Sequence, residues 1–237
     1  MNSSLKLWLS LADVVLLPAF ILWFIWQLQF AARWTWVIFV VWLVASFLLH
    51  RDTAKTLGWR GDNLRPAALQ ALRVFAPPAA GLVTVGLLLG ASRRLPSNLL
   101  SVMATYSAFC LLQQVALNSL VHNRMLSLVR REWVAAGLTG VIFAACHWPN
   151  PLLVPLTFAG GAAMAWMFGR VRNIIPLAIG QAVLGLLVAW AFPVALHHHM
   201  RVGPGYYEWP KSLSDFRGAQ MPRPALPTVA RAPGRHD

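Results

Sequence analysis

The sequence predicts an all-α fold, a polytopic membrane bundle of about seven transmembrane helices. Composition is the first observation behind this prediction, since 58% of the 237 residues are hydrophobic and only 11% are charged. A soluble domain has about 25% charged residues, so this chain has too few to cover a surface that faces water. The second observation is that apolar runs recur from Leu7 to Phe192, each close to the roughly 20 residues that one span needs.

The pattern of the apolar runs predicts helices, because segments such as Val37 to Leu49 are apolar on every side, whereas barrel strands alternate polar and apolar residues. Cys110 and Cys146 fall within such runs, so we expect them to be reduced, small hydrophobic residues. The predicted spans cover residues 7–27, 35–49, 69–91, 98–121, 133–148, 152–169 and 174–193.

Positive charge distinguishes the two ends of the predicted bundle. The net charge is +13, but the cations lie mainly between the apolar runs and in the tail, which favours contact with lipid headgroups over nucleic-acid binding. The more basic set of loops contains Lys6, Arg51, Lys55, Arg60, Arg65, Arg124, Arg130, Arg131, Arg170 and Arg172, and the other contains Arg33, Arg93 and Arg94. By the positive-inside rule we expect an integral protein of a bacterial inner (plasma) membrane with a cytoplasmic N-terminus.

Three regions follow from these patterns. Residues 1–50 hold the first two transmembrane helices, and residues 51–193 form the membrane core. Residues 194–237 make a basic tail rich in Pro and Gly, which we expect to be disordered because it has little apolar surface to bury.

Polar side chains inside the spans are the first functional candidates, because they are costly in lipid unless they face other helices or a wet cavity. Four-residue spacing places Gln114 and Asn118 on one helix face, and Phe143 and His147 on another. The alternative interpretation is that these groups are interhelical hydrogen bonds of about 0.6–2 kcal/mol each. The set is Asp13, Gln113, Gln114, Asn118, His147 and Gln181.

These residues together resemble the CPBP family (Abi, or CAAX-protease-like) of intramembrane endopeptidases, which carries the motifs EExxxR, FxxxH and a later HxxxN or HxxxD. The second motif is intact as Phe143 and His147 in "FAACHWPN". In the first, Gln113, Gln114 and Asn118 stand at the two Glu and the Arg, and in the third, Gln181 and Gly185 stand at the His and the Asn. The segment "TLGWRGDNLR" is similar to the stretch before the family's core, so the resemblance covers roughly residues 55–193.

The resemblance implies hydrolysis of peptide bonds inside the membrane, with a glutamate and the FxxxH histidine activating water and the third motif stabilising the oxyanion. An amide cannot accept the proton that a carboxylate takes, and losing a general base costs ~10²–10⁴ in rate. At the third motif, Gly185 offers no side chain to the oxyanion, and one lost donor costs roughly 10²–10³. The leading hypothesis is therefore a family-like membrane protein with lost or reduced proteolysis and a scaffold or binding role.

Two alternatives remain open. The chain is an active endopeptidase if Asp13, the only acid within a predicted span, supplies the missing carboxylate. It is a transporter or channel component if the polar residues line a pathway, although inverted repeats are absent. We expect no metal and no cofactor, and we expect the lipid bilayer, membrane peptides or partner helices as partners.

Overall fold

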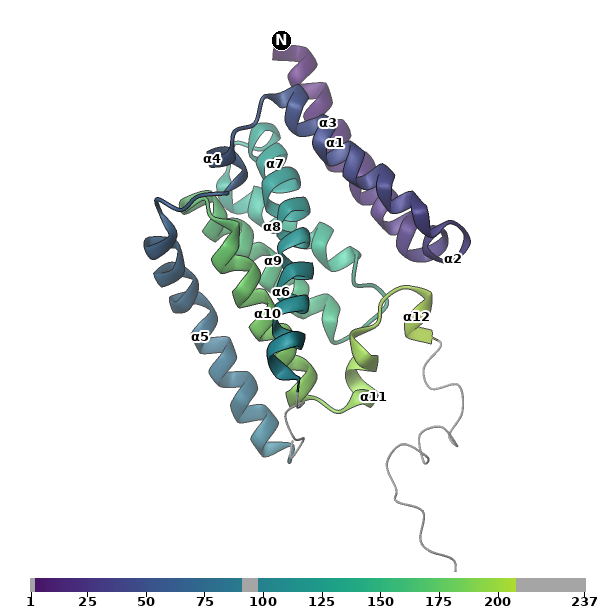
Figure 1. The fold of residues 1–237 in the computed structure, drawn as a ribbon, viewed down its shortest axis with the longest axis vertical. Helices are drawn as coiled ribbons and strands as arrows, with labels where there is room; N and C mark the ends of the chain where they lie inside the picture. The colour runs from purple at the N-terminus through teal and green to yellow at the C-terminus, as the bar shows by residue number, and fades with distance from the viewer. Residues whose placement is uncertain (1–2, 91–97, 208–237) are drawn as a thin grey trace, which may run out of the picture.

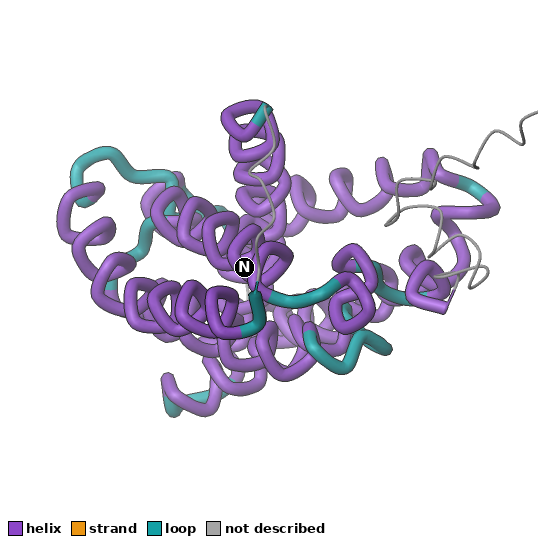
Figure 2. The backbone as a smooth tube through the Cα atoms, turned by 90° about the horizontal axis from the view of Figure 1, so that it is seen from below, coloured by secondary structure: helices purple, strands orange, loops and turns teal. Residues whose placement is uncertain are grey.

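The computed structural model describes residues 3–90 and 98–207, and these residues form helices and turns without a strand (Figures 1 and 2). The predicted helical bundle is therefore confirmed. Arg93, Arg94 and residues 208–237 of the predicted tail lie outside the described part. The α-helices of four or more residues in the described part are α1 (Ser3–Trp23), α3 (Trp36–His50), α4 (Ala54–Leu57), α5 (Leu64–Leu88), α6 (Leu99–Gln114), α7 (Asn123–Leu128), α8 (Glu132–Ala145), α9 (Leu153–Arg170), α10 (Ile174–Ala191), α11 (Val194–His197) and α12 (Pro204–Tyr207).

Five continuous helical stretches within the described residues are long and apolar enough to cross a membrane, namely Ser4–Ala31, Arg33–His50, Leu64–Leu88, Leu99–Leu128 and Ile174–Ala191. The two other predicted spans, 133–148 and 152–169, differ from these. α8 has 14 residues, which at 1.5 Å per residue is roughly 21 Å and less than the ~30 Å of a hydrocarbon core. α9 has 18 residues, but its Gly, Thr, Pro and Trp residues and Arg170 lower its mean hydropathy.

The N-terminal hairpin consists of α1, which continues through a π-helical turn η1 (Phe24–Leu28) and α2 (Gln29–Ala31), and of α3, which returns beside it (Figure 1). Its inner side contributes Leu17 and Leu43 to a buried cluster that also contains Leu120 and Val121. This apolar contact packs the hairpin against the long central helix.

That central helix is α6, η3 (Val115–His122) and α7 in one run without a break. η3 has π-helical hydrogen bonding, in which each turn holds an extra residue, and such segments are frequent at functional sites. Leu117, Asn118, Ser119, Leu120, Val121 and His122 are all buried, so this segment is surrounded by the other helices.

Small residues allow close packing elsewhere in the core. A Cβ added to Gly140 of α8 would lie 3.0 Å from Ala162 Cβ of α9, so these two helices touch through their backbones. α10 packs on α5 and α6, and a Cβ on its Gly180 would lie 2.1 Å from Phe75 Cδ2. These contacts fix the positions of the helices that carry the polar residues.

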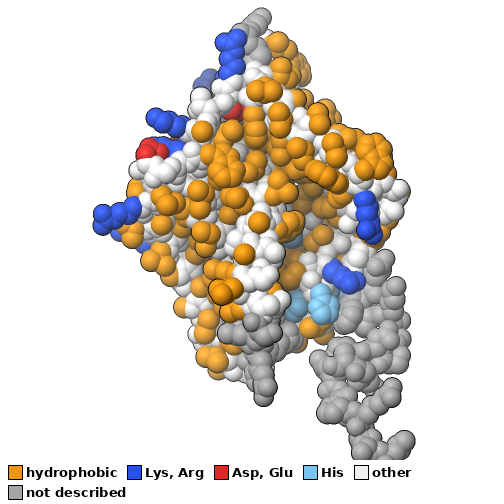
Figure 3. All heavy atoms as spheres, in the orientation of Figure 1, with side chains coloured by type: hydrophobic (Ala, Val, Ile, Leu, Met, Phe, Trp, Pro, Cys, Tyr) orange, Lys and Arg blue, Asp and Glu red, His pale blue; other side chains and the backbone are white. Residues whose placement is uncertain are grey.

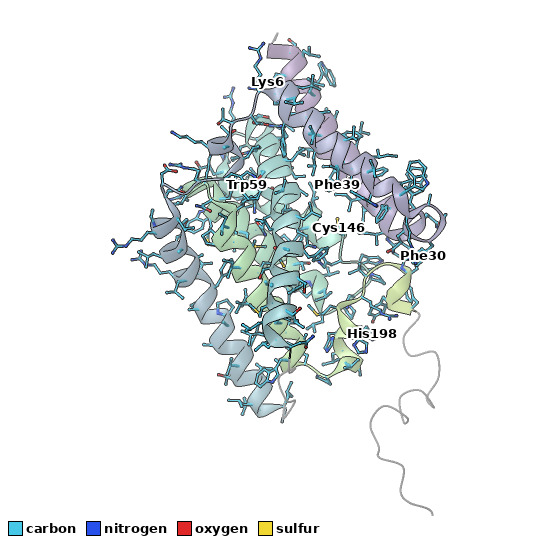
Figure 4. All side chains as sticks on the ribbon, in the orientation of Figure 1. Lys6, Phe30, Phe39, Trp59, Cys146 and His198 are labelled. Atoms are coloured by element: carbon cyan, nitrogen blue, oxygen red, sulfur yellow. The ribbon has the colours of Figure 1, made fainter. Side chains whose placement is uncertain are left out.

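Hydrophobic side chains cover most of the flank in Figure 3, whereas Lys and Arg side chains lie toward its margins. One margin is the end where α1, α5, α8 and α10 begin and where α3, α7 and α9 finish (Figure 1). Figure 4 places Lys6 at this end and His198 at the opposite one. The loops that the sequence grouped as the basic set thus meet at a single end of the bundle.

Candidate functional site

Three glutamine side chains from α6 and α10 form a chain of hydrogen bonds inside the bundle. Gln114 Nε2 donates to Gln181 Oε1 at 2.6 Å, and Gln181 Nε2 donates to Gln113 Oε1 at 2.6 Å. Gln114 is completely buried, and leaving a buried amide without a partner costs ~1–3 kcal/mol. The chain of amides therefore holds α6 and α10 in one register while it keeps the site free of charge.

Asn118 extends this chain by one turn, as the four-residue spacing predicted. Its Nδ2 donates to Gln114 Oε1 at 2.5 Å, and Gln114 Nε2 also contacts Met164 Sδ at 3.0 Å. Asn118 is fully buried, and its Oδ1 has no hydrogen-bond partner in the described structure. The amide chain thus ends in Asn118 Oδ1, a buried acceptor to which no described group donates a hydrogen bond.

His147 lies in the turn after α8, and its hydrogen bond defines its tautomer. Nδ1 is 2.7 Å from the carbonyl oxygen of Phe143, and because a carbonyl only accepts, the proton of the neutral ring is on Nδ1. The ring also packs edge-to-face against Phe143 with centroids 4.7 Å apart. Nε2 keeps its lone pair, which can accept a proton or a hydrogen bond.

The structure brings Gln113, Gln114, Asn118 and Gln181 into one hydrogen-bonded group, but it does not bond His147 to them. The link between the two parts is apolar. Phe143 belongs to the same buried cluster as Met164, whose sulfur contacts Gln114. The candidate site therefore has an amide part between α6 and α10 and a histidine part at the end of α8.

The position that has Asn in the family motif is filled from a different helix. A Cβ added to Gly185 of α10 would lie 2.4 Å from the hydroxyl oxygen of Tyr106 on α6. Tyr106 packs with Cys110, Ala178 and Ala182, which form the small-residue contact between these helices. A phenol hydroxyl thus occupies the space next to Gly185, and no feature of the sequence alone pointed to Tyr106.

Asp13 lies in a separate polar cluster between α1, α3 and α7. Its Oδ1 accepts a hydrogen bond of 2.9 Å from Trp42 Nε1, and its Oδ2 accepts one of 2.5 Å from Ser46 Oγ. Arg124 Nε reaches the same carboxylate at 3.2 Å, and Arg124 Nη2 reaches Asp52 at 2.5 Å. With these partners the Asp13 carboxylate is committed to an ion pair and three hydrogen bonds.

Arg124 is the main residue of this cluster that the sequence did not single out. It is only 4% exposed, although its place near the end of an apolar run is typical of a loop cation. His50 Nε2 also lies 3.5 Å from Asp13 Oδ2. The residues Asp13, Trp42, Ser46, His50, Asp52 and Arg124, which we call the ion cluster, join the N-terminal hairpin to the central helix.

The segment around α4, which carries the similarity to the stretch before the family's core, is bonded to the α9–α10 loop. Arg172 Nη1 donates to Thr56 O at 3.1 Å, and Asn173 Nδ2 donates to Arg60 O at 2.7 Å. Burial lowers the pKa of the Arg172 guanidinium, whereas the hydrogen bond from Arg60 lowers the pKa of the exposed Asp62 carboxyl. These contacts join the α4 segment to the α9–α10 loop at the basic end of the bundle.

Asn150 organises the opposite end. Its Oδ1 accepts from the backbone N–H groups of Leu152 and Leu153, which begins α9, and its Nδ2 donates to His197 O at 3.0 Å. Gly203 N donates to Trp148 O at 2.9 Å. Part of the predicted tail, residues 194–207, thus forms short helices that pack on the turn containing His147.

Apolar hollows lie beside that turn. One, of about 440 Å³, is an open hollow between α8 and α9 and is lined by Val141, Ala144, Ala145, Trp148, Val154, Pro155 and Phe158. Another, of about 390 Å³, is lined by Leu22, Trp26, Ala145 and Trp148. Both adjoin the residues next to His147, and both offer a ligand only apolar contacts.

The donor set does not fit a metal ion. No group of three or more His, Cys, Asp or Glu side chains that could hold one exists among the described residues. Cys110 and Cys146 are free cysteines, as predicted. The neutral amides of the glutamine chain are weaker metal ligands than the carboxylates and imidazoles that proteins normally use.

The fold and site define an integral membrane protein, a helical bundle with a polar, uncharged site between its core helices. Residues 110–187 match the family model of type II CAAX prenyl endopeptidase Rce1-like proteins. This match confirms the resemblance to the CAAX-protease-like family, and it covers α8, α9 and most of α10 together with Gln113, Gln114 and His147. No curated protein and no solved structure matches the chain.

Proposed function

We propose that this protein is a non-catalytic relative of the CAAX-protease-like endopeptidases, which binds membrane peptides or partner helices without cutting them. The observation that carries the proposal is the continuous chain of amides from Asn118 through Gln114 and Gln181 to Gln113. Every link in this chain is neutral. Hydrolysis of a peptide bond needs a base to activate water, and an amide does not take up a proton at neutral pH.

The acidic residues of the described chain support this proposal. Asp13 and Asp52 are paired with Arg124, Asp62 is paired with Arg60, and Glu132 is exposed at the start of α8. Both oxygens of the Asp13 carboxylate are already held by Trp42, Ser46 and Arg124, in a cluster separate from the amide chain. The residue that the sequence offered as a substitute base, Asp13, is therefore poorly suited to activate water.

The groups that remain suit recognition. Gln113 Nε2 makes no hydrogen bond within the described structure, and a polar N–H of this kind can bind a backbone carbonyl. The apolar hollows beside Trp148 can take hydrophobic side chains of a membrane-embedded segment. A polar contact flanked by apolar surface is the usual composition of a ligand site.

Orientation belongs to the same proposal. We place the protein in a bacterial inner membrane with the basic end of the bundle, and so the start of α1, in the cytoplasm. Since α10 ends at the opposite side of the bundle, residue 207 then lies toward the outer face (Figure 1). Cysteine labelling at Ser4 and at Tyr207 with a membrane-impermeant maleimide in intact cells tests this, and labelling of Ser4→Cys would contradict it.

An assay on purified protein in liposomes tests the loss of proteolysis. Wild type, His147→Ala and Gln113→Glu/Gln114→Glu are compared on a library of membrane-peptide substrates, with Gln27→Glu as a control that adds a carboxylate outside the site. We expect no turnover by wild type and, if the carboxylates are what is missing, a gain only in the double Glu variant. Turnover by wild type that His147→Ala abolishes would contradict the proposal.

That result would favour the second candidate function, an active endopeptidase with a variant site. The observation in its favour is the lone pair on His147 Nε2, which the Nδ1–H contact to Phe143 O leaves available as a base. Its activity would then depend on pH through one histidine, without a carboxylate partner.

A further inference from the structure

The charges on the described residues are unevenly matched. Each acidic side chain already has a cationic partner: Asp13 and Asp52 bind Arg124, Asp62 binds Arg60, and Glu132 lies 3.8 Å from Arg170. The basic end of the bundle also carries exposed cations without an acidic partner in the described structure, namely Lys6, Arg51, Lys55, Arg65, Arg130 and Arg131. This end therefore has a surplus of positive charge that the acidic side chains in residues 3–90 and 98–207 do not neutralise.

The surplus includes one compact corner, where α8 begins and α9 ends. Because these helices pack side by side, Glu132 at the start of α8 meets Arg170 at the end of α9. Their contact is weak, since both side chains are more than half exposed, at 58% and 64%. Arg130 and Arg131 immediately precede Glu132 and are exposed as well.

Two exposed tryptophans indicate the depth of this corner in the membrane. Trp133 is 67% exposed and Trp166 is 40% exposed, and tryptophans at such positions lie at the boundary between headgroups and acyl chains. The Arg170 guanidinium stands 5.1 Å from the Trp166 ring centroid, a cation–π contact that orients it. The corner thus combines guanidinium groups with tryptophans at headgroup depth.

We propose that the α8–α9 corner, formed by Arg130, Arg131, Trp133, Trp166 and Arg170, binds the headgroup of an anionic phospholipid. A phosphodiester with net negative charge matches the guanidinium groups of Arg130 and Arg131 and that of Arg170, whose contact with Glu132 is weak, because guanidinium groups form paired hydrogen bonds to phosphate oxygens. Phosphatidylcholine is disfavoured because its ammonium brings a positive charge to a site that already has an excess. The lipid's acyl chains lie along the apolar flank below the tryptophans.

Native mass spectrometry of the full chain, released from nanodiscs of phosphatidylcholine and phosphatidylglycerol, tests this proposal. The test variant is Arg130→Gln/Arg131→Gln/Arg170→Gln. The control is Arg33→Gln/Arg201→Gln, which removes two exposed cations from the opposite end. Each interfacial arginine strengthens binding of an anionic lipid about fivefold, so the test variant should lose about two orders of magnitude in phosphatidylglycerol affinity.

We expect wild type and control to retain phosphatidylglycerol over phosphatidylcholine, and the test variant to retain the two lipids alike. Equal retention of both lipids by wild type would overturn the proposal. So would an equal loss in Lys6→Gln/Lys55→Gln, because the whole basic end and not the corner would then attract the lipid. Displacement of the lipid by millimolar glycerol phosphate would overturn the assignment to a bilayer lipid in favour of a soluble phosphate. None of these outcomes depends on whether the protein cuts peptides.

Discussion

Removing the Arg124 side chain should destabilise the bundle more than any other single loss of charge that we can identify in it. Arg124→Met keeps the length and apolar stem of the side chain but leaves two carboxylates without their cation. Asp13 is 6% exposed, and the Asp52 side chain is 11% exposed, so water cannot replace the guanidinium well. Breaking a buried ion pair from one side costs about 3–5 kcal/mol, and we expect a loss in this range.

Unfolding by SDS in mixed micelles, followed by tryptophan fluorescence, measures this loss. Arg33→Met is the matched control, because Arg33 is exposed and has no acidic partner in the described structure. Such a surface change should stay within about 0.5 kcal/mol. The N-terminal hairpin should also become more accessible to protease in Arg124→Met, since Asp13 lies on α1 and Ser46 on α3.

The double variant Asp13→Asn/Arg124→Gln separates the ion pair from simple packing. Residues that contact each other in one network show coupling of about 0.5–3 kcal/mol, so the double variant should be less destabilised than the two single variants together. If Arg124→Met unfolds at the same SDS concentration as Arg33→Met, the cluster is hydrated and our reasoning about a buried charge is wrong.

Three further predictions concern packing and the amide chain. Gly180→Ala should cost about 1–3 kcal/mol in SDS unfolding, because its Cβ would collide with Phe75, whereas Gly137→Ala, with open space around it, should be neutral or stabilising. Gln181→Leu should cost about 1–3 kcal/mol, because it leaves the side-chain amides of Gln113 and Gln114 without their hydrogen-bond partner. An unchanged midpoint of SDS unfolding would show that water replaces the lost hydrogen bonds. Asn150→Ala should release residues 194–207 from the α8–α9 turn, which faster hydrogen exchange at the backbone of these residues would reveal and unchanged exchange would contradict.

The sequence predicted the helical class and most of the long helices because apolar runs of membrane length are a direct signal. It also predicted that Gln114 and Asn118 share a helix face, and their hydrogen bond is what that spacing produces. The boundary between α8 and α9 was less precise, since the predicted span 133–148 ran on to Trp148 before Pro149, whereas α8 ends at Ala145.

Residues that act across the fold could not be found in this way. Arg124 looks like a loop cation until the positions of Asp13 and Asp52, distant in sequence, are known. The Tyr106 hydroxyl next to Gly185 could not be predicted for the same reason, because the contact depends on how α6 packs against α10. The apparent gap in the third motif is visible from the sequence, but the group that fills it is not.

The π-helical stretch between Gln114 and Asn123 has a consequence for insertions and deletions. Each residue of an ordinary α-helix advances the side chains by about 100° around the axis, so one residue more or less rotates everything that follows by that amount. The wide turn sets the phase between the glutamines of α6, which point at α10, and Arg124, which points at the N-terminal hairpin. A single deletion within residues 115–122 would therefore shift one polar cluster relative to the other unless the wide turn narrowed to an ordinary α-helical turn.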